Sequence, residues 1–339
     1  MNLLGYVARR LLLLVPMLVG ITLFSFLLSH AVPADPVTAN LGEQAAADPE
    51  VVAAFRQAWG LDRPLHAQYL IYLWNLARGD FGTSISTKQP VALDLRQRFP
   101  ATVEVAMIAM AISLAVGVPL GILSAVRRDS LLDQITRLLS LVGVSMPVFW
   151  LGLVALVVFY ARLGWAPAPG RLSAGIIPPT FATGFLLIDS LREWRIDAAV
   201  DALLHLALPG VVLSSYTLGV IARITRGSLL ETLGEDYVRT ARAKGLPNLA
   251  VIVRHAARNG LIPVVTVVGL SFGRLLSGAV VTESVFAWPG LGLYAFRSAT
   301  SLDFPAIMGV GIVIATIYVL VNLVVDIAYG LLDPRIRVG

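Results

Sequence analysis

Six apolar stretches of 19 to 24 residues constrain the fold of this chain more than any other feature. Each is long enough to cross a bilayer as a helix, which takes about 20 residues. Backbone amides in lipid must be hydrogen-bonded within their own segment, so such stretches are expected to be helical. The six runs are Leu11–Ser29, Val105–Val126, Leu138–Ala161, Ala202–Ala222, Asn259–Thr282 and Phe304–Val325.

The composition agrees with a membrane protein. Hydrophobic residues make up 57% of the 339 residues and charged residues 14%, whereas a soluble domain carries about 25% charged residues. Six buried helices in a soluble protein would need a polar shell that this chain lacks. We therefore expect an all-α integral membrane protein with six transmembrane helices. The absence of Cys excludes disulfides, Cys-ligated zinc and thiol nucleophiles.

The first apolar run also has features of a secretory signal peptide. Arg9 and Arg10 precede it, and Ser29-His30-Ala31 places small residues at cleavage-like positions. The hydrophobic region of a signal peptide spans about 7–15 residues, and this run is longer, at 19 residues. We expect an uncleaved first transmembrane helix.

The distribution of Lys and Arg between the loops predicts the orientation of the chain. If the N-terminus is cytoplasmic, the inside segments hold 14 basic residues in 71 positions and the outside segments hold 11 in 136. The inside segments are 1–10, 127–137, 223–258 and 326–339, and the outside segments are 30–104, 162–201 and 283–303. Both termini are therefore expected in the cytoplasm.

The longest loop, 30–104, contains helical patterns of its own. One pattern begins at Pro49, and a second follows Pro64 and stops at Gly79. They predict a small external subdomain of two or three short helices. The loop 162–201 is rich in Pro and Gly and is expected to be irregular.

Proline and small residues recur within the runs. Each proline is expected to kink its helix because it removes a backbone donor. The prolines within or at the edge of the runs are Pro16, Pro119, Pro147, Pro209 and Pro263. Small residues at four-residue spacing predict close contacts between helices. These are Gly117 and Gly121, then Gly269, Gly273 and Ser277.

Arg274 is the one Lys or Arg within a run, sixteen residues after Arg258 and nine before Glu283. A charge at that depth is costly unless it faces a wet cavity or a partner. Two interpretations stay open: Arg274 lines a pathway and meets an anionic substrate group, or it forms a structural pair with an acidic or carbonyl group. We place Arg274 in a candidate pathway together with Pro147 and Tyr216.

The segment between the fourth and fifth runs predicts a short helix with marked ends. Thr232 and Glu235 have the spacing of a capping box. Gly245 suits the position after a helix end, and Pro247 stops the helix. We therefore expect a helix of about three turns over Leu233–Lys244.

A second helix is expected from about Asn248. Small side chains at Ala241, Ala243 and Gly245 would let the first helix enter a groove of a partner, and the basic residues Arg239, Arg242 and Lys244 supply charge. A basic face that rests on anionic lipid is the alternative.

This segment resembles the EAA loop of ABC importer permeases, and most closely that of the dipeptide/oligopeptide/nickel branch. The resemblance is carried by Glu235–Gly245 with Arg254-His255-Ala256 and Arg258-Asn259. It extends over nearly the whole chain. The further motifs, in order, are Arg9–Leu12 with Pro16, Ala34-Asp35-Pro36, Gly60–Pro64, Gly79–Gly82, Phe99–Glu104, Phe286–Gly292 and Leu331–Arg337.

The chain departs from the general pattern of the family at three places. Arg239-Thr240-Ala241 stands where the wider family has Glu-Ala-Ala, so the role of that Glu is not transferable. The later Ile-x-Leu-Pro positions fall on His255, Ala257 and Arg258. Ala34 stands where the branch usually has Gly, which affects a turn.

The resemblance implies a type I ABC importer permease fold and a half-transporter in a bacterial inner membrane. The implied partners are a second homologous permease, two ABC ATPases, an external substrate-binding protein and membrane lipid, without nucleic acid. The implied division is 1–30 as the first transmembrane helix, 31–100 as the external subdomain, 101–330 as the type-1 domain with its coupling loop 231–259, and 331–339 as a cytoplasmic tail. The ATPase-coupling residues are Glu235, Asp236, Tyr237, Arg239, Thr240, Ala241, Arg242, Ala243, Lys244 and Gly245.

The chain itself is not expected to be an enzyme. It has no G-x-x-x-x-G-K-[ST] phosphate loop, so ATP and Mg are expected on the partner ATPases and no cofactor on this chain. The four His residues are scattered, without the spacing of metal ligands, and no metal site is predicted.

Only the resemblance to this family limits the range of possible substrates. Phe185–Asp189 resembles a feature of dipeptide-type permeases and favours short peptides. Permeases of nickel chelates, glutathione or oligosaccharides in the same family are alternatives. Ion-coupled secondary transport is a rival of a different class, and it usually places Asp or Glu within the helices, whereas the six runs contain neither. A scaffold protein is a third class.

Overall fold

The computed structural model describes residues 3–31, 47–58, 60–180 and 182–332. Every regular element in these ranges is a helix, apart from an isolated antiparallel bridge between Thr83 and Pro90. The predicted all-α class is confirmed. Two of the sequence motifs, Ala34-Asp35-Pro36 and the tail from residue 333, lie outside the described residues.

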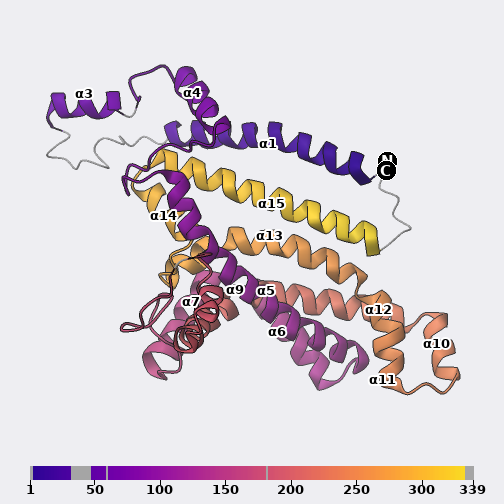
Figure 1. Ribbon diagram of the computed structural model, residues 1–339. Helices are drawn as coiled ribbons and strands as arrows, with labels where there is room; N and C mark the ends of the chain where they lie inside the picture. Colours follow the sequence, from indigo (N-terminus) through magenta and orange to yellow (C-terminus); the bar gives the residue numbers. More distant parts are fainter. Residues whose placement is uncertain (1–2, 32–46, 59, 181, 333–339) are drawn as a thin grey trace. The chain divides into compact units, whose positions relative to one another are not determined.

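The chain forms two compact units. The first takes in residues 101–288 and the part of the last helix from Leu320, and the second takes in the segment up to Pro100 and Pro289–Val319. Two long helices, α5 (Val91–Val126) and α15 (Phe304–Leu332), contribute to both units. Figure 1 shows the helices with their labels.

The first unit contains most of the helices. In chain order they are α6 (Leu131–Ser145), α7 (Val148–Ala155), the π-helix η1 (Leu156–Arg162), α8 (Leu186–Arg192), α9 (Ile196–Leu233), α10 (Asp236–Ala243), α11 (Asn248–Ala250), the π-helix η2 (Val251–Ala256), α12 (Ala257–Gly260) and α13 (Ile262–Val285). The second unit contains α1 (Leu3–Ala31), α3 (Pro49–Ala58), α4 (Leu65–Ala77) and α14 (Leu291–Thr300). The short helices α3 and α4 are those predicted for the longest loop.

Several helices are long and apolar enough to cross a membrane. Among the described residues, α5, α9 and α15 each pass this test alone, with mean hydropathies of 2.3, 1.7 and 2.4. Two bent pairs pass it together: α6 with the α7–η1 segment, at 105°, and α11–α12 with α13, at 54°. In α1 the apolar part is Leu12–Leu27. The count of six spans stays a prediction.

The third run is not the continuous helix that its apolar length suggested. It breaks after Ser145, where Met146 is extended and Pro147 precedes α7. Pro147 has no amide hydrogen for the helical ladder, which accounts for a break at this point. By contrast, Pro16 and Pro209 lie inside helices that continue through them, so the kink expected at each of these two prolines stays a prediction.

The α6 and α9 backbones approach each other closely. A Cβ at Gly143 of α6 would lie 2.7 Å from the carbonyl oxygen of Ser215, and one at Gly219 of α9 would lie 2.7 Å from that of Ser140. Only glycine fits at such a crossing. On α5, a Cβ at the predicted packing residue Gly121 would lie 2.6 Å from the carbonyl oxygen of Ala222.

The loop 162–201 contains more order than its composition suggested. Residues 186–192 form α8, and the Asp189 carboxylate accepts hydrogen bonds from the amides of Thr183 and Gly184. Arg171 binds the carboxylate of Glu104 on α5. The expectation of an irregular loop was wrong for α8, because Asp189 stabilises the turn that leads into the helix.

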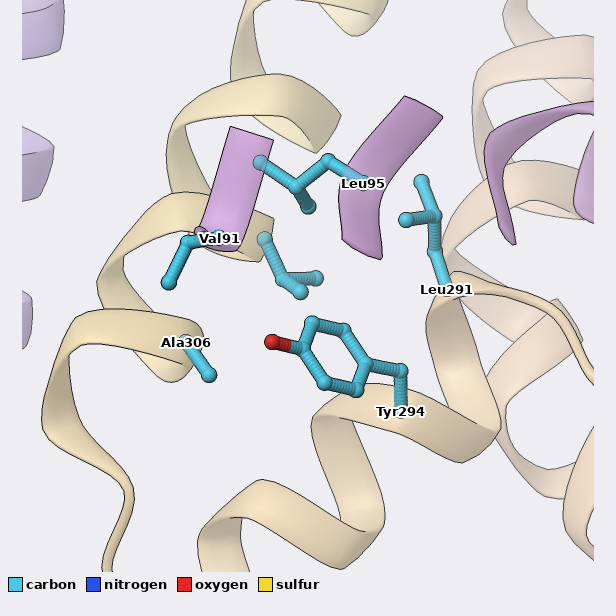
Figure 2. Packing of buried hydrophobic residues seen from close by; sticks show 6 residues of the cluster. Val91, Leu95, Leu291, Tyr294 and Ala306 are labelled. Atoms are coloured by element: carbon cyan, nitrogen blue, oxygen red, sulfur yellow. The ribbon is translucent and has the colours of Figure 1, made fainter. Parts of the chain in front are cut away.

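The second unit has an apolar core between the start of α5, α14 and the start of α15. Figure 2 shows Val91 and Leu95 of α5 facing Leu291 and Tyr294 of α14 and Ala306 of α15, all of them buried. These side chains recur three or four residues apart on each helix, as one face of a helix requires.

Polar contacts surround this core. The Tyr294 hydroxyl donates to Asp94 of α5 at 3.0 Å, and burial raises the pKa of this hydroxyl above its usual value. Near the start of α15, the carboxylate of Asp303 binds the hydroxyl of Ser84 and the amide of Ser86.

Candidate functional site

The helix α10 is shorter than the sequence predicted. It runs over Asp236–Ala243, not Leu233–Lys244, because α9 continues to Leu233 beyond its apolar run. Thr232 therefore lies in the last turn of α9, where its hydroxyl donates to the carbonyl of Ser228 at 2.8 Å. Glu235 is the N-cap residue of α10 and makes no side-chain cap. The predicted capping box is wrong.

The C-terminal end of α10 is as predicted. Gly245 follows the C-cap residue Lys244 and has φ of +75°, a left-handed conformation that glycine adopts without strain. Its amide donates to the carbonyl of Arg242 at 3.0 Å. Pro247 then precedes α11, which begins at the expected Asn248.

One face of α10 packs against its own unit. Val238 is fully buried and Ala241 is 5% exposed. They join a cluster with Ala125, Leu229, Val251 and Ala256. The small side chain of Ala241 had suggested that it enters a partner's groove. It is instead buried within its own unit and is not available to a partner.

The other face of α10 is open. The exposed candidates are Glu235, Asp236, Tyr237, Arg239, Thr240, Arg242, Ala243, Lys244 and Gly245. The ion pair between Arg239 and Asp236, at 3.3 Å, lies at the surface with side chains 78% and 93% exposed. Solvent screens such a pair, so both charges can be redirected to a partner.

Tyr237 connects α10 to the segment that leads into α13. Its hydroxyl accepts a hydrogen bond from Asn259 Nδ2 at 3.0 Å and donates to the carbonyl of His255 at 3.4 Å. The position of α10 next to α11 and α12 is visible in Figure 1. Tyr237 therefore connects α10 to α12 through a side chain, in addition to the backbone.

Two of the three candidate pathway residues, Arg274 and Tyr216, are joined by a hydrogen bond. Arg274 of α13 donates from Nη1 to the hydroxyl of Tyr216 on α9, at 3.3 Å. Arg274 is exposed, and no ion pair joins it to an acidic residue in the described ranges. Its guanidinium therefore keeps donors available. The third candidate, Pro147, marks the bend between α6 and α7.

The structure adds buried carboxylates that the apolar runs did not contain. The helices extend beyond those runs and include Glu104, Asp133 and Glu283, each at most 5% exposed. Arg171 binds Glu104, Arg226 binds Asp133, and the Thr102 hydroxyl donates to Glu283 at 2.6 Å. The apolar runs end at charged residues, so none of these three carboxylates belongs to a run. The described helices therefore contain acidic side chains, which ion-coupled transporters usually place within theirs.

The second unit holds a cavity of about 350 Å³ beside α4. Its lining combines the aromatic residues Phe26, Tyr72 and Phe304 with the charged residues Arg63 and Asp80. The pKa of the Tyr72 hydroxyl is raised by burial. The cavity is large enough for a small side chain or peptide segment.

Comparisons with known proteins give the family. Residues 117–338 match the model of binding-protein-dependent transport system inner membrane components, and residues 3–106 match the N-terminal model of such membrane components. A structure of inward-facing conformations of the MetNI methionine ABC transporter matches with a TM-score of 0.49 and 16% identity, over 69% of this chain and 93% of that one.

Relatives of similar length are also named as transport proteins. The chain is 47% identical to the probable D,D-dipeptide transport system permease protein DdpB of Escherichia coli strain K12, over 96% of this chain and 95% of that protein. It is 46% identical to the di/tripeptide transport system permease protein DppB of Pseudomonas aeruginosa strain UCBPP-PA14, over 98% and 99%. The chain belongs to the family of binding-protein-dependent transport system inner membrane components.

Proposed function

We propose that this chain is the permease subunit of an ATP-driven ABC importer for dipeptides and short oligopeptides. The observation that carries the proposal is the similarity to dipeptide and di/tripeptide permeases over nearly the whole chain. Family membership makes the chain a multi-pass membrane transport subunit and not an enzyme. The proposed substrate, a short peptide, is inferred from the names of these relatives.

The proposed mechanism is alternating access driven from outside the chain. The exposed face of α10 would dock on one of two partner ATPases, which bind ATP and Mg. Closure of the ATPases would move α10, and the buried contacts of Val238 and Ala241 would carry the movement to α9 and η2. A second homologous permease would complete the pathway, and both termini would lie in the cytoplasm.

The remaining roles follow from position. We assign Arg274 and Tyr216 to the pathway, because the guanidinium donors that remain after the Tyr216 hydrogen bond suit a peptide carboxylate. The short helices α3 and α4, with the cavity beside α4, are the proposed seat for an external binding protein. This protein would deliver the peptide.

Purification of the tagged chain from its native membrane tests the assembly. In mild detergent, a second permease and chains with the phosphate loop should accompany it. Reconstituted with them and the binding protein, the complex should take up radiolabelled dipeptide only with ATP. Uptake of glutathione, a nickel chelate or an oligosaccharide in place of the dipeptide would redirect the substrate assignment. A chain that purifies alone and moves solute without ATP would refute the importer proposal.

A further inference from the structure

A second cavity, of about 420 Å³, lies between α6 and α9 in the first unit. Three arginines line it, Arg137 from α6 and Arg223 and Arg226 from α9. The hydroxyl residues Thr136 and Ser140 lie in the same lining. The guanidinium groups therefore give the cavity positive charge and hydrogen-bond donors, which suit an anion.

The cavity carries more positive charge than its own acid can balance. Arg226 binds the buried carboxylate of Asp133 through Nε and Nη2, at 2.7 and 2.8 Å. Arg137 lies 3.9 Å from the same carboxylate and its side chain is 55% exposed. Arg223 is exposed and forms no ion pair with a described residue. Two of the three guanidinium groups thus share the Asp133 carboxylate and the third has no acidic partner among the described residues, so the three arginines and the one carboxylate leave a net charge of +2 for a ligand.

The depth of the cavity matches that of a lipid headgroup. Arg226 precedes the end of α9 at Leu233 by seven residues, about 10 Å along a helix. Arg137 lies six residues after the start of α6 at Leu131. Both positions are therefore close to one end of a proposed membrane span, where headgroups lie.

An apolar surface adjoins the charged cavity. On α6, Leu138 and Leu141 are 61% and 59% exposed, and Leu141 also lines the cavity. A free phosphate could bind the arginines but would make no favourable contact with the exposed leucines. An anionic lipid could contact both, because its phosphate binds the guanidinium groups and its acyl chains cover the leucines.

We propose that this cavity binds the phosphate group of an anionic phospholipid. Arg137 and Arg223 donate to the phosphate, and the acyl chains lie along Leu138 and Leu141. Arg226 pairs with Asp133 and thereby holds α9 against α6 at the wall of the cavity. This site is separate from α10 and goes beyond the proposed transport role.

Native mass spectrometry of the full-length chain in mild detergent tests the proposal. The probes are phosphatidylglycerol, zwitterionic phosphatidylcholine and glycerol 1-phosphate, each titrated separately. The variant is Arg137→Gln with Arg223→Gln, which leaves the Arg226 pair with Asp133 intact. The matched control is Arg127→Gln with Arg128→Gln, which removes two exposed charges from the loop just before α6.

Phosphatidylglycerol should bind the native chain more tightly than phosphatidylcholine. The cavity variant should bind phosphatidylglycerol roughly 10- to 30-fold more weakly, since each arginine contributes a separate interaction with the anionic group. The control should change the affinity less than about threefold, as expected for charges outside the site. If the double variant does not fold, Arg223→Gln alone should still weaken binding measurably.

Other outcomes would overturn the proposal. An equal loss of phosphatidylglycerol affinity in the cavity variant and the control would indicate that the lipid is attracted by the general surface charge and not by this cavity. Equal binding of the two lipids would remove the anionic preference. Binding of glycerol 1-phosphate as tight as that of the lipid would identify a soluble phosphate site. If the lipids do not bind and the variant fails to assemble with partner chains, the cavity is a subunit contact.

Discussion

The guanidinium of Arg226 on α9 holds both carboxylate oxygens of Asp133 on α6, at 2.7 and 2.8 Å. The hydroxyl of Ser124 on α5 and the amide of Asp129 bind the same carboxylate. The Asp133 side chain is fully buried. One charged group therefore connects three helices close to the end of α9 from which α10 follows.

Asp133→Ala should destabilise the chain strongly. Removing one partner of a buried pair leaves the other charge uncompensated, which costs about 3–5 kcal/mol. Thermal unfolding of the purified chain in detergent measures the effect. Asp197→Ala is the control, because its pair with Arg195 is exposed and solvent screens it. Equal loss in the two variants would contradict the central role of Asp133.

Two alanines on α10 should respond differently to the same substitution. Ala241→Glu would bury a carboxylate among Val238, Leu229 and Val251, so the yield of folded chain should fall. Ala243→Glu changes only the exposed face. It should leave folding unchanged and reduce ATP-driven uptake, because the ATPase is proposed to dock there.

The readouts for this pair are the yield of monodisperse protein and uptake in reconstituted vesicles. Full uptake by the Ala243→Glu variant would count against the coupling role of the exposed face. Normal yield of the Ala241→Glu variant would contradict the burial of Ala241. The two results are independent of each other.

Gly121→Ala should destabilise the contact between α5 and α9. The new Cβ would lie 2.5 Å from Thr225 Cβ and 2.6 Å from the carbonyl oxygen of Ala222, and overpacking of this kind costs about 1–3 kcal/mol. Gly227→Ala is the matched control, since no atom lies within 4 Å of its Cβ. In the interior of α9 it should instead stabilise by about 0.5–1 kcal/mol. Unfolding temperatures that move in the same direction would contradict the packing.

The sequence predicted most of the helices, because long apolar runs and helix-ending residues are local signals. The end of α10 at Gly245 and the start of α11 at Asn248 are examples. The start of α10 was missed because Thr232 fits a capping box and a helix interior equally well. Only the continuation of α9 decides between them.

The partners of the site residues depend on packing between distant helices. Charge alone singled out Arg274, but the hydrogen bond to Tyr216 follows from the contact of α13 with α9. Burial of Ala241 was not predictable, because alanine suits a partner's groove as well as the chain's own core. Asp133 and Arg226 are 93 residues apart, and no local pattern connects them.

Arg274→Leu should lower peptide uptake without lowering the yield of assembled complex. The side chain is exposed and makes one described hydrogen bond, to Tyr216, so its loss should cost little stability. Loss of a charged donor to a substrate carboxylate would reduce kcat/KM for uptake about tenfold or more. Tyr216→Phe removes only the hydroxyl and should have a smaller effect.

The chemistry of the peptide separates the two interpretations of Arg274. If the guanidinium meets the peptide carboxylate, the native complex should transport a free dipeptide better than its C-terminal amide. Arg274→Leu should abolish this preference, whereas Arg274→Lys should keep part of it because the charge remains. A loss of complex yield with the preference intact would instead assign Arg274 to a structural pair, since a structural group supports assembly but does not distinguish the two peptides.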